Sequence, residues 1–97
     1  MVVRVLDHVK SASSYEDGEV IFRIIFDEIT RDKNVQINFN GITSVPSAFV
    51  NSAFIRLLEH FSFEKIRERL TFIESTKQIN DLIKSRFEFV VKNSSPS

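Results

Sequence analysis

The sequence lacks cysteine and tryptophan altogether and has only two glycines and two prolines among its 97 residues. Without cysteine the chain has no disulfide, no thiol nucleophile and no thiolate metal ligand. It also lacks an excess of either charge, because 13 basic residues balance 13 acidic ones. Nucleic-acid binding depends on a concentrated basic surface that displaces counterions, so a nucleic-acid partner is not expected.

Long hydrophobic runs are missing as well. The apolar stretches are far shorter than the roughly 20 residues that span a bilayer. Charge appears early, at Arg4 and Asp7, where a signal peptide would have its apolar core. We therefore expect a cytoplasmic protein without a membrane partner. The length fits a single domain over residues 1–92, followed by a disordered tail over residues 93–97.

The residues that are present have the composition of an ordinary globular chain, 42% hydrophobic and 27% charged. Their periodicity predicts a succession of strands and helices. Alternating apolar residues predict four strands, at residues 2–9, 35–40, 69–74 and 87–92. The 3.6-residue period predicts a helix of about fourteen residues that starts near Asp17, a second over residues 47–61, and a third after a cap at Ser75 or Thr76. Residues 63–70 are interpreted as a solvated mixed-charge connection.

The order of these elements is β-α-β-α-β-α-β, which predicts the α/β class and a small sandwich with a mixed, mostly parallel four-stranded sheet. Residues 35–40 form its central strand. Val35, Ile37 and Phe39 share one face of that strand and polar side chains share the other. The sheet should therefore be covered mainly on one side, or have a second face that is only partly covered. A strand is the alternative interpretation of residues 19–29, which are rich in isoleucine and valine.

Ten phenylalanines in so small a domain either fill the core completely or leave some rings for a partner, and seven of the ten residues from 20 to 29 are apolar. A helix with so many apolar residues either packs on two sides or exposes an interface. We therefore expect residues 20–29 to contribute to an interface, in the simplest case that of a homodimer.

Hydroxyl side chains gather between the central strand and the second helix, in the sequence TSVPS. Ser47 can act as the helix cap, although Pro46 favours the first helical position and would move the cap to Val45 or Ser44. The same helix start, with Ser44 and Ser47 as extra donors, can instead contact an anion or a partner. Phosphorylation of Ser44 or Ser47 is the third alternative. The candidate partner- or anion-binding residues are Thr43, Ser44, Val45, Pro46, Ser47 and Asn51.

Other candidate chemistry has little support. His8 and His60 lack metal-ligand spacing and are interpreted as structural. A hydrolase triad of Ser47, His60 and Asp81 lacks the G-x-S-x-G turn that exposes the serine. Neighbouring acids on a helix diverge, so they do not form a magnesium site. The sequence predicts no enzyme, no metal and no cofactor.

The segment INFNGITSVPSAF resembles the STAS domain (sulphate transporter and anti-sigma factor antagonist), and in particular its STAS-like bacterial branch. In the STAS pattern a short apolar strand carries Asp or Asn, a hydrophobic residue follows, and Asp-Ser-Ser-Gly opens a helix. Asn38 and Ile42 match the first two positions. The STAS-like branch tends to have Ser-Phe at this helix start and DGE at the opening of a preceding helix, and Phe49 and Asp17–Glu19 fit these two features.

The helix-opening motif departs from the STAS pattern at residues 46–49. Ser47 stands on the first serine of the motif, and Ala48 stands on the second, which the partner kinase phosphorylates in anti-sigma factor antagonists. The resemblance therefore implies no phosphorylation at that position. It implies a non-catalytic regulatory module that docks a protein, with a kinase-like ATPase as the candidate partner. The docking surface would be the loop of residues 41–47, with Val45 and Pro46 at its tip, and the start of the following helix. The alternative is a small anion- or nucleotide-binding domain that uses the same helix start.

Overall fold

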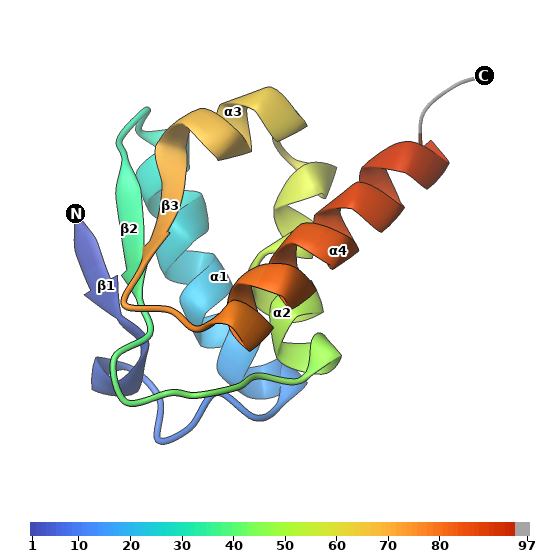
Figure 1. The fold of residues 1–97 in the computed structure, drawn as a ribbon. Coiled ribbons are helices and arrows are strands. Elements are labelled where there is room, and N and C mark those ends of the chain that lie inside the picture. Colours follow the sequence, from blue (N-terminus) through green and yellow to red (C-terminus); the bar gives the residue numbers. More distant parts are fainter. Residues whose placement is uncertain (95–97) are drawn as a thin grey trace.

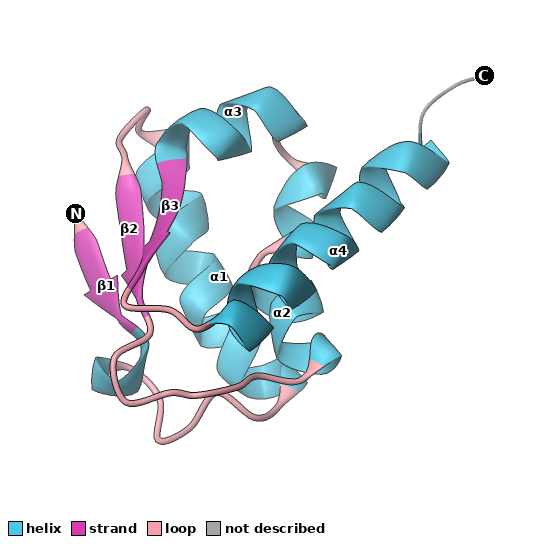
Figure 2. Cartoon of the chain, in the orientation of Figure 1, coloured by secondary structure: helices cyan, strands magenta, loops and turns pink. Residues whose placement is uncertain are grey.

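The computed structural model describes residues 1–94, and Figure 1 shows a sheet with the α-helices gathered on one side of it. Figure 2 shows how few residues lie in strands compared with helices. The elements, including the short 3₁₀ helices η1 and η2, are β1 (Val2–Arg4), η1 (Val5–Asp7), α1 (Tyr15–Thr30), β2 (Val35–Asn38), α2 (Ser47–Ala53), η2 (Ile55–Glu59), α3 (Phe63–Arg69), β3 (Leu70–Ile73) and α4 (Lys77–Ser94). The class is α/β, as predicted.

The sheet has the order β1-β2-β3 and both strand pairs are parallel. This confirms the central position of the strand that begins at Val35. Val35, Ile37 and Phe39 are fully buried beneath the helices, whereas Gln36 is exposed. The register places Val2 and Thr71 beside Gln36, and both of these are exposed too. The prediction of a sheet covered mainly on one side is therefore confirmed (Figure 1).

The predicted fourth strand is wrong, because residues 87–92 belong to α4. Ile79, Ile83 and Phe87 are buried at intervals of four residues, so the helical period continues through the segment interpreted as a strand. No glycine or proline interrupts residues 77–94. Among the described residues the sheet is three-stranded and parallel rather than four-stranded and mixed. Of the predicted tail, residues 93 and 94 are helical and residues 95–97 lie outside the described residues.

The predicted helix over residues 47–61 is divided at Phe54, which separates α2 from η2. The Phe54 ring is fully buried and lies 5.1 Å from the Phe72 ring and 6.0 Å from the Phe49 ring. Residues 63–70, predicted to be a connection, contain α3, which Ser62 caps by accepting a hydrogen bond from Lys65 N. The first strand is also shorter than predicted, since it ends at Arg4.

The helical interpretation of residues 19–29 is confirmed by α1. Its apolar residues are used on two sides. Ile21, Ile25 and Ile29 are fully buried in the core. On a second side Phe26 packs against His60, with ring centroids 4.9 Å apart. Packing within the domain thus accounts for most of the apolar residues of α1. The homodimer stays a prediction, but the number of apolar residues in α1 no longer supports it.

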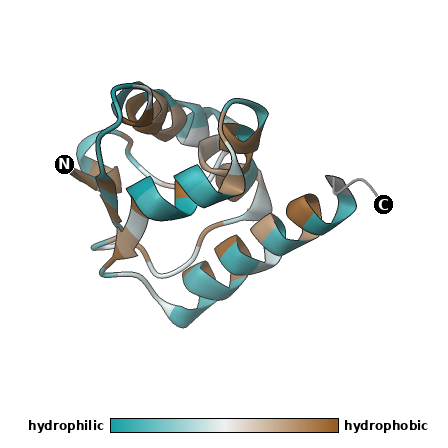
Figure 3. Cartoon of the chain, turned by 90° about the horizontal axis from the view of Figure 1, so that it is seen from above, coloured by the Kyte–Doolittle hydropathy of each residue, from teal (hydrophilic) through white to brown (hydrophobic). Residues whose placement is uncertain are grey.

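Helix α4 alternates hydrophobic and hydrophilic residues along its length, as Figure 3 shows. Thr76 caps it by accepting a hydrogen bond from Ile79 N at 3.3 Å, which confirms the second of the two predicted caps. Among residues 1–94, no helix has the length and apolar character that a membrane crossing requires.

Candidate functional site

The loop of residues 41–47 leaves the carboxyl end of β2 and leads into α2. It begins with a turn in which Ile42 N donates to Phe39 O at 2.9 Å. Gly41 has a φ of 87°, a conformation that side chains disfavour. A Cβ atom there would lie 2.9 Å from Leu6 Cδ1. Glycine is therefore needed for the turn that directs the loop.

Side chains at the start of α4 hold the loop backbone. The Gln78 side-chain amide makes two hydrogen bonds to Val45, accepting from Val45 N at 3.1 Å and donating to Val45 O at 3.3 Å. Thr76 Oγ1 donates to Thr43 O at 2.8 Å. The Val45 side chain is 4% exposed and belongs to the core. Val45 thus anchors the loop, and its predicted place at an apolar tip is wrong.

The capping interpretation of the serines is also wrong. Pro46 occupies the N-cap position of α2 and no side chain accepts a capping hydrogen bond. Ser47 is the first helical residue and is exposed, as are Thr43, Ser44 and Pro46. These four residues form one exposed surface, which we call the hydroxyl loop. Asn51 lies one turn further along and accepts a hydrogen bond from Arg86 Nε at 3.1 Å, so it holds α4 beside α2.

A hollow of about 280 Å³ lies beside the hydroxyl loop, between residues 41–44 and the loop that precedes α1. Lys10, Ser11 and Ser13 line its other side. The sequence analysis did not select these residues, although their hydroxyl-rich composition resembles that of TSVPS. The structure thus brings two hydroxyl-bearing segments, about thirty positions apart in the chain, to one place.

Asp17 lies close to this hollow and belongs to the capping box of α1. Its side chain accepts hydrogen bonds from Ser13 N and Ser14 N, both at 3.2 Å. Partial burial acts to raise the pKa of Asp17, but these bonds and those of the two serine hydroxyls outweigh it, so the pKa is lowered. The DGE sequence that supported the resemblance therefore has a structural role at its first residue.

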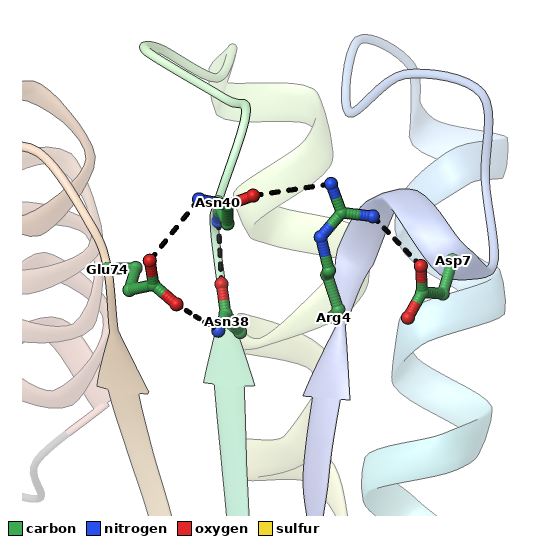
Figure 4. A network of polar contacts seen from close by, with 5 residues as sticks. All are labelled: Arg4, Asp7, Asn38, Asn40 and Glu74. Carbon is green, nitrogen blue, oxygen red and sulfur yellow. Dashed lines mark hydrogen bonds and ion pairs between the residues drawn. The ribbon is translucent and has the colours of Figure 1, made fainter.

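A polar network joins the carboxyl ends of all three strands (Figure 4). The Glu74 carboxylate accepts hydrogen bonds from Asn38 Nδ2 at 2.6 Å and from Asn40 Nδ2 at 3.2 Å. Asn40 Oδ1 accepts from Arg4 Nη2 at 3.3 Å, and Arg4 Nη1 lies 2.8 Å from Asp7 Oδ1. We call these five residues the strand-end network. It fixes the point at which the hydroxyl loop leaves the sheet.

Glu74 adopts a left-handed backbone conformation, with a φ of 49°. This conformation is unfavourable for a residue with a side chain, and the two amide contacts hold it there. The sequence analysis singled out Asn38 through the resemblance and missed Arg4, Asp7, Asn40 and Glu74 as site residues. Asn40 and Glu74 stand at the ends of predicted strands, which is a signal that could have found them. Arg4 and Asp7 lie inside the strand predicted over residues 2–9, and no such signal marks them.

The fold and the site define a class of protein: a small α/β domain in which a hydroxyl-bearing loop follows the central strand of a parallel sheet. Residues 17–80 match the family described as STAS-like domain of unknown function (DUF4325). The match covers more than half of the chain, and the chain belongs to this STAS-like family. The resemblance seen in the sequence is thereby confirmed. No curated protein and no solved structure matches the chain.

Proposed function

We propose that this STAS-like domain is a non-catalytic regulatory module that docks a partner protein through the hydroxyl loop and the start of α2. A kinase-like ATPase is the proposed partner. The observation that carries the proposal is the way the loop is held: Thr43 and Val45 are fixed through their backbones, while the neighbouring hydroxyls of Thr43, Ser44 and Ser47 remain exposed.

A loop fixed in this way supports binding for an energetic reason. Ordering a mobile loop on association costs free energy, and a loop that is already ordered avoids that cost. The hydroxyls can donate and accept hydrogen bonds, so they suit a polar partner surface. Ala48 is exposed and has no hydroxyl, so a phosphate cannot be attached where the STAS pattern has its second serine. We therefore propose constitutive docking.

Site-specific photo-cross-linking in cells tests the docking surface. A photoreactive residue at Ser47 should give one dominant cross-linked protein, and the same residue at Lys33 serves as the control. Lys33 is exposed too, but it lies before β2, at the opposite end of that strand from the hydroxyl loop. Equal cross-linking at both positions, or none at Ser47, would contradict the proposal. Purified partner should then lose affinity for a Ser44→Arg variant.

Titration with ATP and with inorganic phosphate separates this function from the anion-binding alternative. Docking without a ligand predicts no change in the amide resonances of residues 41–51 at micromolar ATP. The alternative has the weaker support because α2 has only seven residues, so its dipole is short. A saturable change at micromolar concentration would favour anion binding. A phosphate found on Ser44 or Ser47 by intact mass would contradict constitutive docking.

A further inference from the structure

Strand β3 forms one edge of the sheet, because it pairs with β2 on one side and with no described strand on the other. Ile73 O accepts a hydrogen bond from Phe39 N at 3.1 Å, so the peptide groups of Ile73 face β2. The backbone N–H and C=O groups of successive residues in a strand point to opposite sides in the plane of the sheet. The backbone N–H and C=O groups of Leu70 and Phe72 therefore point toward the free edge.

The backbone groups of Phe72 are unsatisfied at this edge. Leu70 N is used already, since it donates to Ile66 O at the end of α3. No described residue accepts from Phe72 N or donates to Phe72 O. A free N–H and a free C=O on one residue are the groups that an added strand uses.

A hollow of about 330 Å³ lies next to this edge, on the side of the sheet that the helices cover. Its apolar lining comes from α3, β3 and α4: Phe63, Ile66, Leu70, Phe72 and Phe87. The Phe63 and Phe87 rings lie 5.6 Å apart across α3 and α4. The hydrophobic core thus extends past the last strand. A fourth strand beside β3 would place its inward-facing side chains over the hollow.

The charged residues at the hollow favour an acidic occupant. Arg67 and Lys84 line it against a single acid, Glu88. Both basic side chains belong to exposed residues, and neither is paired with an acid among the described residues. Within this lining two basic groups stand against one acidic group, and Arg67 also lines a second hollow together with Glu64 and Glu68.

We propose that the free edge of β3 and the adjoining hollow bind an extended segment of a partner protein, which adds to the sheet as a fourth strand. Alternate apolar side chains of the segment fill the hollow, and an acidic side chain faces Arg67 and Lys84. This mode of recognition combines backbone hydrogen bonds with side-chain pockets. The surface is separate from the hydroxyl loop, so the inference goes beyond the proposed function and does not depend on it.

A second copy of the chain fits the edge less well. Two β3 strands could pair, but the inward side chains of the added strand would be Leu70 and Phe72. These side chains already pack in their own domain, where Leu70 is 5% exposed and the Phe72 ring lies 6.0 Å from the Phe39 ring. The hollow would therefore stay unfilled. A separate segment brings side chains that are free to enter it.

The test uses an end-blocked peptide about nine residues long, which is within the usual length of a strand. On the face that turns toward the hollow it carries valines and, beside them, one glutamate, and the alternate residues on the other face are threonines. Titrated into isotope-labelled protein, it should shift the amide resonances of β3, of α3 and of α4 around Lys84, and protect Phe72 N–H from exchange. Lys84→Glu should weaken binding about tenfold, the effect of losing one favourable charge contact. Lys77→Glu, an exposed lysine of the same helix that does not line the hollow, should bind like the unmodified protein.

Two further peptides make the outcome decisive. Methylation of alternate backbone nitrogens should abolish binding, and the same peptide with lysine in place of its glutamate should bind more weakly. No shift at millimolar peptide, or shifts confined to residues 41–51, would overturn the proposal. So would protection of Phe72 N–H that grows with protein concentration in the absence of peptide, because that result assigns the edge to a second copy.

Discussion

At the residue scale, two serines near helix starts differ in what their hydroxyls contact. Ser14 Oγ accepts a hydrogen bond from Asp17 N at 3.1 Å, and Asp17 Oδ2 accepts one from Ser14 N at 3.2 Å, which completes a capping box. Ser47 makes no such contact and is exposed. The difference arises because Pro46 occupies the cap position of α2, so that Ser47 is already inside the helix.

Replacement of each serine by alanine should reveal this difference in stability. Ser14→Ala should lower the free energy of unfolding by about 1 kcal/mol, the usual cost of losing an N-cap. Ser47→Ala should change it by less than about 0.5 kcal/mol, as is common for exposed sites. Urea denaturation measures both. A larger loss for Ser47→Ala than for Ser14→Ala would contradict the assigned caps.

Asp17 should make the free energy of unfolding depend on pH. Its pKa is lowered in the folded protein, so its stabilising contribution is present above the pKa of the unfolded chain, about 3.9, and is lost as the pH falls through the folded pKa. Asp17→Asn should therefore be less stable than the unmodified protein at pH 7, and the difference should shrink below about pH 4. Denaturation at several pH values measures it. A difference that stays constant would argue against this linkage.

At the element scale, α1 approaches α2 closely at Gly18. A Cβ atom on Gly18 would lie 1.8 Å from Ser52 Oγ and 2.7 Å from Phe49 O. Ser52 is fully buried and donates to Phe49 O at 3.2 Å, so its hydroxyl has little freedom to move. The absence of a side chain at residue 18 thus sets the distance between the two helices.

Gly18→Ala should destabilise the protein by about 1–3 kcal/mol, the range for overpacking a core. In an exposed helix the same change would stabilise by about 0.5–1 kcal/mol, so the sign is diagnostic. Adding Ser52→Ala should recover part of the loss, because it removes the nearest atom but leaves Phe49 O in place. Thermal unfolding of the single and double variants measures this. A stabilised Gly18→Ala variant would contradict the packing of α1 on α2.

The first turn of α4 should control the order of the hydroxyl loop through Gln78. Gln78→Ala removes both hydrogen bonds to Val45 and should cost about 1 kcal/mol. The Val45 amide should then exchange with solvent faster. Asn80→Ala, an exposed side chain two positions along the same helix, is the control and should leave that exchange rate unchanged. Equal exchange in both variants would show that Gln78 does not hold the loop.

At the scale of the whole molecule, the strand-end network ties the three strands together at the edge where the hydroxyl loop begins (Figure 4). One of its residues, Glu74, combines favourable contacts with an unfavourable backbone conformation. Substitution can separate the two effects. Alanine removes the contacts and keeps the backbone cost, whereas glycine removes both.

Glu74→Gly should therefore be more stable than Glu74→Ala, by about 1 kcal/mol, the cost of a left-handed residue with a side chain. In both variants the side-chain amide protons of Asn40 should exchange with solvent faster, since Asn40 Nδ2 loses its acceptor. Denaturation and amide exchange measure these effects. If the alanine variant proved the more stable of the two, the left-handed conformation of Glu74 would be refuted.

The sequence by itself determined the features that depend on local periodicity. The alternation at Val35, Ile37 and Phe39 was enough to predict a central strand with one covered face, and Ser75 and Thr76 could be named as the two candidate caps of the last helix. The apolar period of residues 19–29 outweighed their β-branched composition, because a helix this rich in isoleucine is stabilised by burial on two sides. The segment around Asn38 also pointed to the STAS-like family.

Only the tertiary structure decided the features that depend on contacts between distant residues. Residues 87–92 alternate like a strand, yet Phe87 packs against Phe63 and the segment continues α4. Buried contacts of the Phe54 ring, not a helix-breaking residue, separate α2 from η2. The partners of Glu74 lie more than thirty positions away in the chain. Local preference is worth a fraction of a kcal/mol per residue, so where it conflicts with core burial, burial determines the structure.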